Sequence, residues 1–183
     1  EKLNSKISIN FDTIYITNKD YLTNFKADMI VNNNQIKDLI LSSQFSTKED
    51  LKLSIKTNSN NERITDLFAG NAKPLVKKYD FIKGFEGGYL KFDSIEKNKV
   101  SNSNLKIFDF KLKEVPALTK LLTLASLQGI ADLLTGEGIR FNELEMIFNN
   151  KAGLMTIEEI YSLGPSISIL MDGYIQKDDL VSL

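Results

Sequence analysis

Few side chains in this sequence have the type and spacing that catalysis or metal binding requires. The 183 residues include no histidine and no cysteine, which removes the commonest general base, thiol nucleophiles and most zinc sites. The adjacent carboxylates Glu158-Glu159 and Asp178-Asp179 would point to opposite faces of a strand, so they do not form an acid–base pair. We therefore predict that the chain is not an enzyme and uses no metal and no other cofactor.

Two glycine-rich stretches and one basic cluster have simpler explanations than ligand binding. The stretch 84–88 lacks the Lys-Ser/Thr pair of a phosphate-binding loop, and the stretch 136–138 lacks the third glycine of a dinucleotide fingerprint. We interpret both as helix ends. Four lysines fall close together: Lys73, Lys77, Lys78 and Lys83. They are typical of a solvated helix face, and contact with lipid phosphate is the alternative.

The overall composition is that of a globular domain without a strong charge. Lys and Arg number 23 against 24 Asp and Glu, which gives a net charge of −1 and no electrostatic reason to expect nucleic acid as a partner. No apolar run is long enough to span a bilayer, so we expect no transmembrane segment in this stretch. Because the first residue is Glu1, we interpret the sequence as an excerpt from a longer chain.

Apolar and polar residues alternate through the first third of the chain, as they do in antiparallel strands that have one wet face. The apolar members of two runs form our candidate binding surface: Phe25, Ala27, Met29, Val31, Leu51, Leu53 and Ile55. Periodicity leaves two alternatives open, because an ordinary closed core and an open concave surface both need one apolar face per strand.

Two segments break the two-residue period and are predicted to be short helical pairs. The first covers residues 62–86, where Ile64, Leu67 and Phe68 have helical spacing. The second covers residues 115–138, which we expect to lie across the sheet and close one end of its groove. Its predicted buried stripe is Leu118, Leu121, Leu122, Leu127, Ile130 and Leu134.

The remaining segments, 1–61, 87–114 and 139–183, are expected to be strands. Between Ile107 and Phe108 the apolar positions change phase, which predicts a bulge or a change of strand partner. The predicted fold is therefore mainly β, of the α+β kind: a single module with a curved antiparallel sheet and two helical pairs packed against it.

The segment from Val115 to Leu183 resembles the AsmA-like C-terminal region, especially that of YhdP-type proteins. The likeness is carried by the double helix LTKLLTLASLQGIADLLTGEGIRF and by the motifs Gly153-Leu154-Met155-Thr156-Ile157, Gly164-Pro165 and Gly173-Tyr174-Ile175. The family commonly has an acidic residue after the last isoleucine, where this chain has Gln176. With a segment around residues 66–88 included, the resemblance covers about two-thirds of the chain.

The resemblance implies a bridge-type lipid-transfer protein of the AsmA and TamB kind in the cell envelope of a diderm bacterium. Such a protein is anchored in the inner membrane and crosses the periplasm. It holds phospholipid acyl chains in an apolar β-groove during transport to the outer membrane, without enzymatic chemistry. The alternative is a scaffold for outer-membrane biogenesis that binds envelope protein partners.

Overall fold

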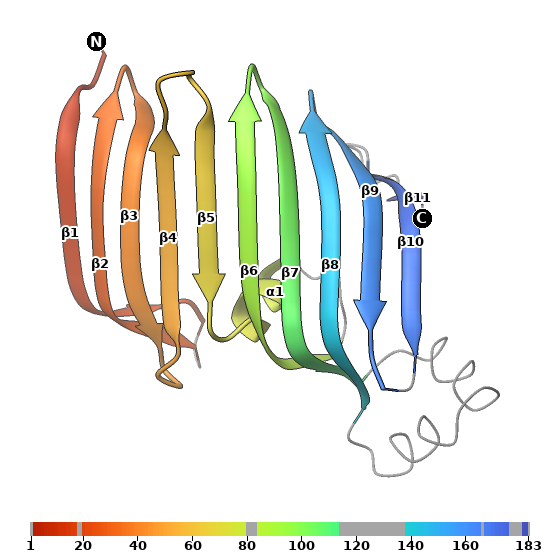
Figure 1. The fold of residues 1–183 in the computed structure, drawn as a ribbon. Helices are drawn as coiled ribbons and strands as arrows, with labels where there is room; N and C mark the ends of the chain where they lie inside the picture. The colour runs from red at the N-terminus through yellow and green to blue at the C-terminus, as the bar shows by residue number, and fades with distance from the viewer. Residues whose placement is uncertain are drawn as a thin grey trace.

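In the computed structural model, the chain forms one antiparallel sheet in which each strand pairs with the next in sequence order (Figure 1). The structure describes residues 2–17, 20–79, 84–113, 138–165, 167–175 and 181–182. The prediction of a mainly-β antiparallel fold is confirmed. The strands before the helix are β1 (Ser5–Tyr15), β2 (Tyr21–Asn32), β3 (Gln35–Phe45), β4 (Asp50–Thr57) and β5 (Arg63–Ala69). After the helix α1 (Lys73–Tyr79) come β6 (Phe85–Lys97), β7 (Val100–Leu112), β8 (Ile139–Lys151), β9 (Leu154–Leu163), β10 (Ser168–Ile175) and β11 (Val181–Ser182).

Three hairpin turns contain two consecutive residues with positive φ, the conformation that fits the twist of adjacent strands. These pairs are Asn33-Asn34, Asn98-Lys99 and Ala152-Gly153. Asparagine tolerates the left-handed region better than most residues do, and it occupies three of these six positions.

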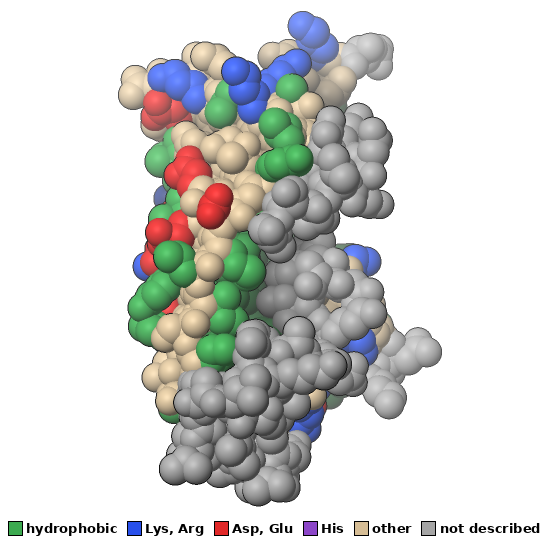
Figure 2. Space-filling view, turned by 90° about the vertical axis from the view of Figure 1, so that its right-hand side faces the viewer, with side chains coloured by type: hydrophobic (Ala, Val, Ile, Leu, Met, Phe, Trp, Pro, Cys, Tyr) green, Lys and Arg blue, Asp and Glu red, His purple; other side chains and the backbone are tan. Residues whose placement is uncertain are grey.

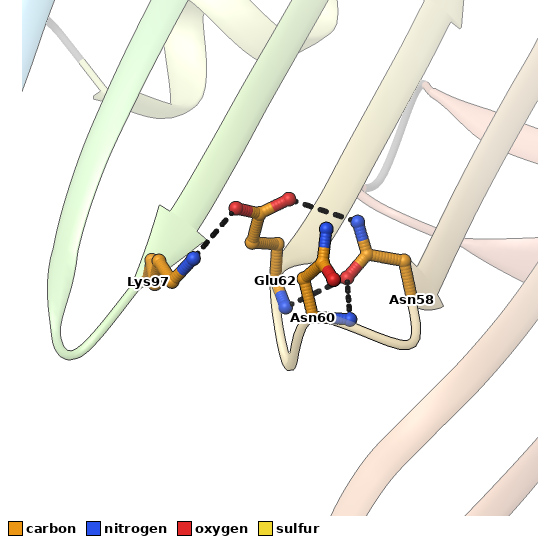
Figure 3. A network of polar contacts seen from close by, with 4 residues as sticks. All are labelled: Asn58, Asn60, Glu62 and Lys97. Atoms are coloured by element: carbon orange, nitrogen blue, oxygen red, sulfur yellow. Dashed lines mark hydrogen bonds and ion pairs between the residues drawn. The ribbon is translucent and has the colours of Figure 1, made fainter.

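The longer turn between β4 and β5 is held by the side chain of Asn58 (Figure 3). Its Oδ1 accepts hydrogen bonds from the backbone N–H groups of Asn60 at 2.9 Å and Glu62 at 3.0 Å. The Glu62 carboxylate in turn accepts from Asn58 Nδ2 and pairs with Lys97 of β6, each at 2.9 Å. The Asn58 amide and the Lys97 ammonium lower the pKa of Glu62. The turn is thereby connected to the neighbouring hairpin.

The prediction of a helix at the start of the segment 62–86 is wrong, because residues Arg63–Ala69 form the strand β5. Leu67 lies opposite Leu53 and Phe92, whereas Phe68 lies opposite Lys52 and Lys91 on the other face. Apolar side chains on both faces of a strand produced a spacing that looks helical. Pairing with a strand on each side satisfies the backbone of β5, and this tertiary context overrides the local pattern.

Of the first predicted pair, only its second helix is present, as α1. The second pair, at 115–138, lies outside the described residues apart from Gly138, and so does its predicted stripe from Leu118 to Leu134. The two-helical-pair detail of the predicted fold is therefore not supported.

Several strands bend where residues adopt left-handed backbone conformations. Asn24 has φ 52°, Gly87 and Gly88 have φ 72° and 74°, and Asp109 has φ 54°. Asp109 reverses the side-chain alternation of β7, so that Ile107 and Phe110 belong to the same core cluster although they are three residues apart. The phase change predicted between Ile107 and Phe108 is therefore at Asp109, and β7 keeps the same partners throughout.

The main core lies at the end of the sheet where α1 packs. Val76 of α1 is 1% exposed, and Ala72 just before the helix is fully buried. Across β6, β7 and β8 the rings of Phe85, Phe110 and Phe141 stack in sequence, with centroids 5.2 Å apart at each step. Burying such rings is worth several kcal/mol, so this end supplies much of the cohesion of the described part of the sheet.

Candidate apolar binding face

One row of apolar residues crosses the sheet from β1 to β10. Residues directly opposite each other in neighbouring strands point to the same face, so the register itself defines the row. We call it the middle row: Ile9, Ala27, Leu41, Leu53, Leu67, Phe92, Leu105, Met146, Ile160 and Met171. No member is polar, and the row joins residues more than 160 positions apart in the sequence.

Two further rows flank the middle row on the same face, and together the three form what we call the apolar face. The lower row runs through Leu51, Ala69, Leu90, Ile107, Leu144, Ser162 and Ile169 towards the core. The upper row consists of Ile7, Met29, Leu39, Ile55, Thr65, Ser94, Ser103, Phe148, Ile157 and Gly173.

The centre of the upper row is a small polar patch within the apolar face. Ser103 Oγ donates a hydrogen bond to Ser94 Oγ at 2.8 Å, and both serines are buried. The rings of Phe92 and Phe148 come within 6.4 Å of each other although their strands, β6 and β8, lie on either side of β7. Because neighbouring strands lie about 4.8 Å apart, both rings must lean over β7.

No described helix or strand forms a second layer over the upper and middle rows. Among the described elements, the main tertiary contacts are those between neighbouring strands and those between α1 and β6. A small cluster of Ala27, Leu39 and Ile55 is buried by its same-face neighbours, and Met29 and Leu53 remain half-buried at its border. Contiguous apolar surface on this scale marks a binding site more often than a free surface.

The opposite face, which we call the polar face, carries charged residues in the same positions of the register. The row behind the middle row includes Lys26, Ser42, Lys52, Phe68, Lys91, Lys106, Glu145, Tyr161 and Leu170. On the same face, Lys91 Nζ lies 5.8 Å from the ring centroid of Phe108. The two faces therefore differ in polarity across nearly the whole width of the sheet.

The best-organised ionic site lies on the polar face, between β7 and β8. Glu145 Oε1 accepts hydrogen bonds from Asn104 Nδ2 at 2.7 Å and from Lys106 Nζ at 3.0 Å. The Asn104 amide and the Lys106 ammonium lower the pKa of Glu145, and the hydrogen bond to Glu145 raises the pKa of Lys106. These shifts come from a structural network on the outside of the sheet, so they do not indicate catalytic chemistry.

The predicted surface residues are brought together on the apolar face. Phe25, Ala27 and Met29 of β2 form one cluster with Leu53 and Ile55 of β4. Leu51 packs against the main core instead. Val31 lies on the same face at the end of β2, next to a bulge that shifts the register with β3.

Sequence reasoning missed the part of the apolar face that lies beyond β4. The alternation of Leu90 with Phe92, and of Leu144 with Met146, was a sufficient signal for each strand alone. It gave no register, and without a register these residues could not be assigned to the same face as Ala27.

The fold and this face define a class: an open antiparallel β-sheet with one apolar and one polar face. Comparison of the chain with protein-family models, with curated proteins and with solved structures finds no match. In the described part of the chain, no helix has the length and hydrophobicity needed to cross a membrane.

Proposed function

We propose that this chain is one segment of a bridge-type lipid-transfer protein, which holds phospholipid acyl chains against its apolar face. In this proposal the parent protein is anchored in the inner membrane, crosses the periplasm and moves phospholipid towards the outer membrane without enzymatic chemistry. The resemblance to the AsmA-like region motivates the envelope setting. The observation that carries the proposal is the upper and middle apolar rows, over which no described helix or strand forms a second layer.

The dimensions of the apolar face suit acyl chains. At about 4.8 Å per strand, a row of ten strands extends for about 43 Å, which exceeds the hydrocarbon thickness of a bilayer of about 30 Å. Contact between water and such an apolar surface is unfavourable, whereas each lipid methylene buried against it contributes about 0.8 kcal/mol to the free energy of binding. The polar face, with Lys52 and Lys106 in the row behind, keeps the other side of the sheet in water.

The test places a photo-crosslinking side chain at Met29 or Leu53 in cells. Both positions lie on the apolar face and should capture phospholipid. The matched control is Lys52, which is adjacent to Leu53 but points to the polar face, with a side chain that is 62% exposed. Equal capture at Lys52 and Leu53 would refute the proposal. Mass spectrometry of lipid extracted from the purified chain would identify the class of lipid.

One observation favours the second candidate function, a scaffold that binds envelope proteins. On β9 and β10 a shallow open depression of about 750 Å³ combines apolar and acidic side chains, including Leu154, Tyr174 and Glu158. Leu170, which also lines the depression, is 69% exposed, and Figure 2, which looks onto this edge of the sheet, shows hydrophobic and acidic groups close together. Loss of protein capture with Leu170→Asp, in a chain that extracts no lipid, would favour the scaffold.

A further inference from the structure

The apolar face becomes polar in steps towards the hairpin turns at one end of its central strands, β5, β6 and β7. In these strands the middle row consists of Leu67, Phe92 and Leu105. The upper row consists of Thr65, Ser94 and Ser103. Next to the turns lies what we call the terminal row, which crosses from β4 to β8 on the same face: Thr57, Arg63, Glu96, Ser101 and Asn150. Each of the three central strands pairs with a strand on both sides (Figure 1), so this gradient lies inside the sheet and not at a lateral edge.

Arg63 is the cation of the terminal row, and its guanidinium makes no ion pair within the described part of the chain. Its Nε atom is buried and has no hydrogen-bond partner among the described residues. Buried polar atoms normally have a partner, so an unpaired one needs an explanation, such as a ligand. A guanidinium presents its donors in a fixed fork that matches the oxygens of a phosphate. Arg63 is therefore suited to bind a phosphate on the apolar side of the sheet.

Glu96 lies directly opposite Arg63 in the register of β5 with β6. Both side chains are half-buried, and among the described residues no ion pair joins them. Opposed Cα atoms in antiparallel strands lie about 4.5–5.5 Å apart, so two opposite charges stand side by side at one level of the sheet. A ligand that carries both a phosphate and an ammonium group matches this arrangement, because each of its charges meets the opposite one.

Hydroxyl groups lie one level further from the turns. Ser94 Oγ accepts a hydrogen bond from Ser103 Oγ at 2.8 Å, which leaves the Ser94 proton to donate. Thr65 lies directly opposite Ser94 and is half-buried. Two residues of a strand span about 6.8 Å, so the hydroxyls lie midway between the level of Arg63 and the middle row. They can donate to the carbonyl oxygens of a ligand that spans these levels.

We propose that these levels form one headgroup site for a phospholipid that carries an ammonium group, of the ethanolamine type. Arg63 binds the phosphate, and Glu96 binds the ammonium group. Thr65 and Ser94 donate hydrogen bonds to the ester carbonyl oxygens. The acyl chains continue over the middle row towards the main core.

The order of groups along the strands is the order of groups in a phospholipid, whose ester carbonyls lie between its phosphate and its acyl chains. A free phosphate would use Arg63 alone, and a diacylglycerol would use only the hydroxyls and the apolar rows. The inference rests on the proposed function, because it specifies which lipid the apolar face holds and in which direction that lipid points.

Lipid competition tests the headgroup site on the purified chain. The chain is incubated with vesicles of phosphatidylethanolamine and phosphatidylglycerol in equal amounts, with a minor share of diacylglycerol that has the same acyl chains. Mass spectrometry of the bound lipid gives two ratios, each relative to the vesicle composition. Phospholipid should be enriched roughly tenfold over diacylglycerol, through charge-assisted hydrogen bonds to Arg63. Phosphatidylethanolamine should be enriched about two- to fivefold over phosphatidylglycerol, as a partly exposed charge pair allows.

Three variants assign these ratios to their residues. Arg63→Gln should remove the enrichment over diacylglycerol, whereas Glu96→Gln should remove only the preference for phosphatidylethanolamine. Arg63→Lys keeps the charge without the planar fork, so it should retain part of the first enrichment. The matched control is Lys56→Gln, which removes an exposed cation of β4 at the same end of the sheet but on the polar face, and it should leave both ratios unchanged. Circular dichroism checks that each variant is folded.

The outcomes separate the headgroup site from the proposed function. A native chain that binds lipid without headgroup preference, or ratios that Arg63→Gln and Glu96→Gln leave unchanged, would overturn the headgroup site and leave the apolar face as a lipid-binding surface. An equal loss of enrichment in Lys56→Gln would also overturn it, because overall charge would then set the preference. A native chain that binds no lipid would refute both proposals.

Discussion

Replacing Gly88 by alanine should destabilise the protein more than replacing Gly87, although the two glycines have nearly the same backbone conformation. Their φ angles are 74° and 72°. They differ in the space that a Cβ atom would occupy. At Gly88 it would lie 2.8 Å from the backbone oxygen of Phe108 and 3.0 Å from Cβ of Phe110, whereas at Gly87 its nearest neighbour is the Asp109 oxygen at 3.5 Å.

The expected magnitudes follow from these two differences. Both alanines bear the left-handed penalty of about 1–2 kcal/mol. Only Gly88→Ala adds a steric clash with backbone, for which overpacking data give about 1–3 kcal/mol. The free energy of unfolding should therefore fall by about 1–2 kcal/mol for Gly87→Ala and by about 2–5 kcal/mol for Gly88→Ala. In a chain of this length 1 kcal/mol corresponds to about 2–4 °C in Tm.

Urea unfolding of the native chain and both variants, followed by circular dichroism, measures these differences. A third variant, Gly87→Asn, separates backbone strain from size. Asparagine adopts positive φ more readily than alanine does, so this variant should lose less stability than Gly87→Ala. If Gly87→Ala and Gly88→Ala are equally destabilised, β6 does not approach β7 closely at Gly88, and the steric reasoning is wrong.

Two other substitutions test the core and the polar face. Ile107 is fully buried whereas Ile40 on the polar face is 59% exposed, so Ile107→Ala should cost about 2–5 kcal/mol and Ile40→Ala at most about 0.5 kcal/mol in denaturant unfolding. Because the folded-state pKa of Glu145 is lowered, its contribution to stability is present above the unfolded value near 4.5 and disappears as the pH falls through the folded value. Glu145→Gln should therefore be less stable than the native chain at pH 7, and melting curves should show this difference shrinking below about pH 4.5. A difference that does not depend on pH would exclude the ionised carboxylate as its source.

Much of the fold was predictable from local pattern. The alternation of Phe25, Ala27 and Met29 predicted both a strand and the residues on its apolar side, and the structure places them together. The turn at Asn58 was predictable from its asparagine-rich composition. The wrong helix prediction at β5 had a specific cause. Leu67 and Phe68 point to opposite faces of a strand that pairs on both sides. Sequence spacing alone cannot distinguish two adjacent apolar residues in such a strand from one turn of a helix.

The sequence by itself determined the sorting of side chains within each strand, because successive residues of a strand point to opposite faces whatever the strand pairs with. It also determined the absence of histidine and cysteine chemistry. Only the tertiary structure decided the register, which aligns Ile9, Leu67 and Met171 in one row although the chain separates them widely. It also decided the reversal of faces at Asp109, because a left-handed residue inside a strand is stabilised by the packing of Phe110 between Phe85 and Phe141, contacts that lie far apart in the sequence.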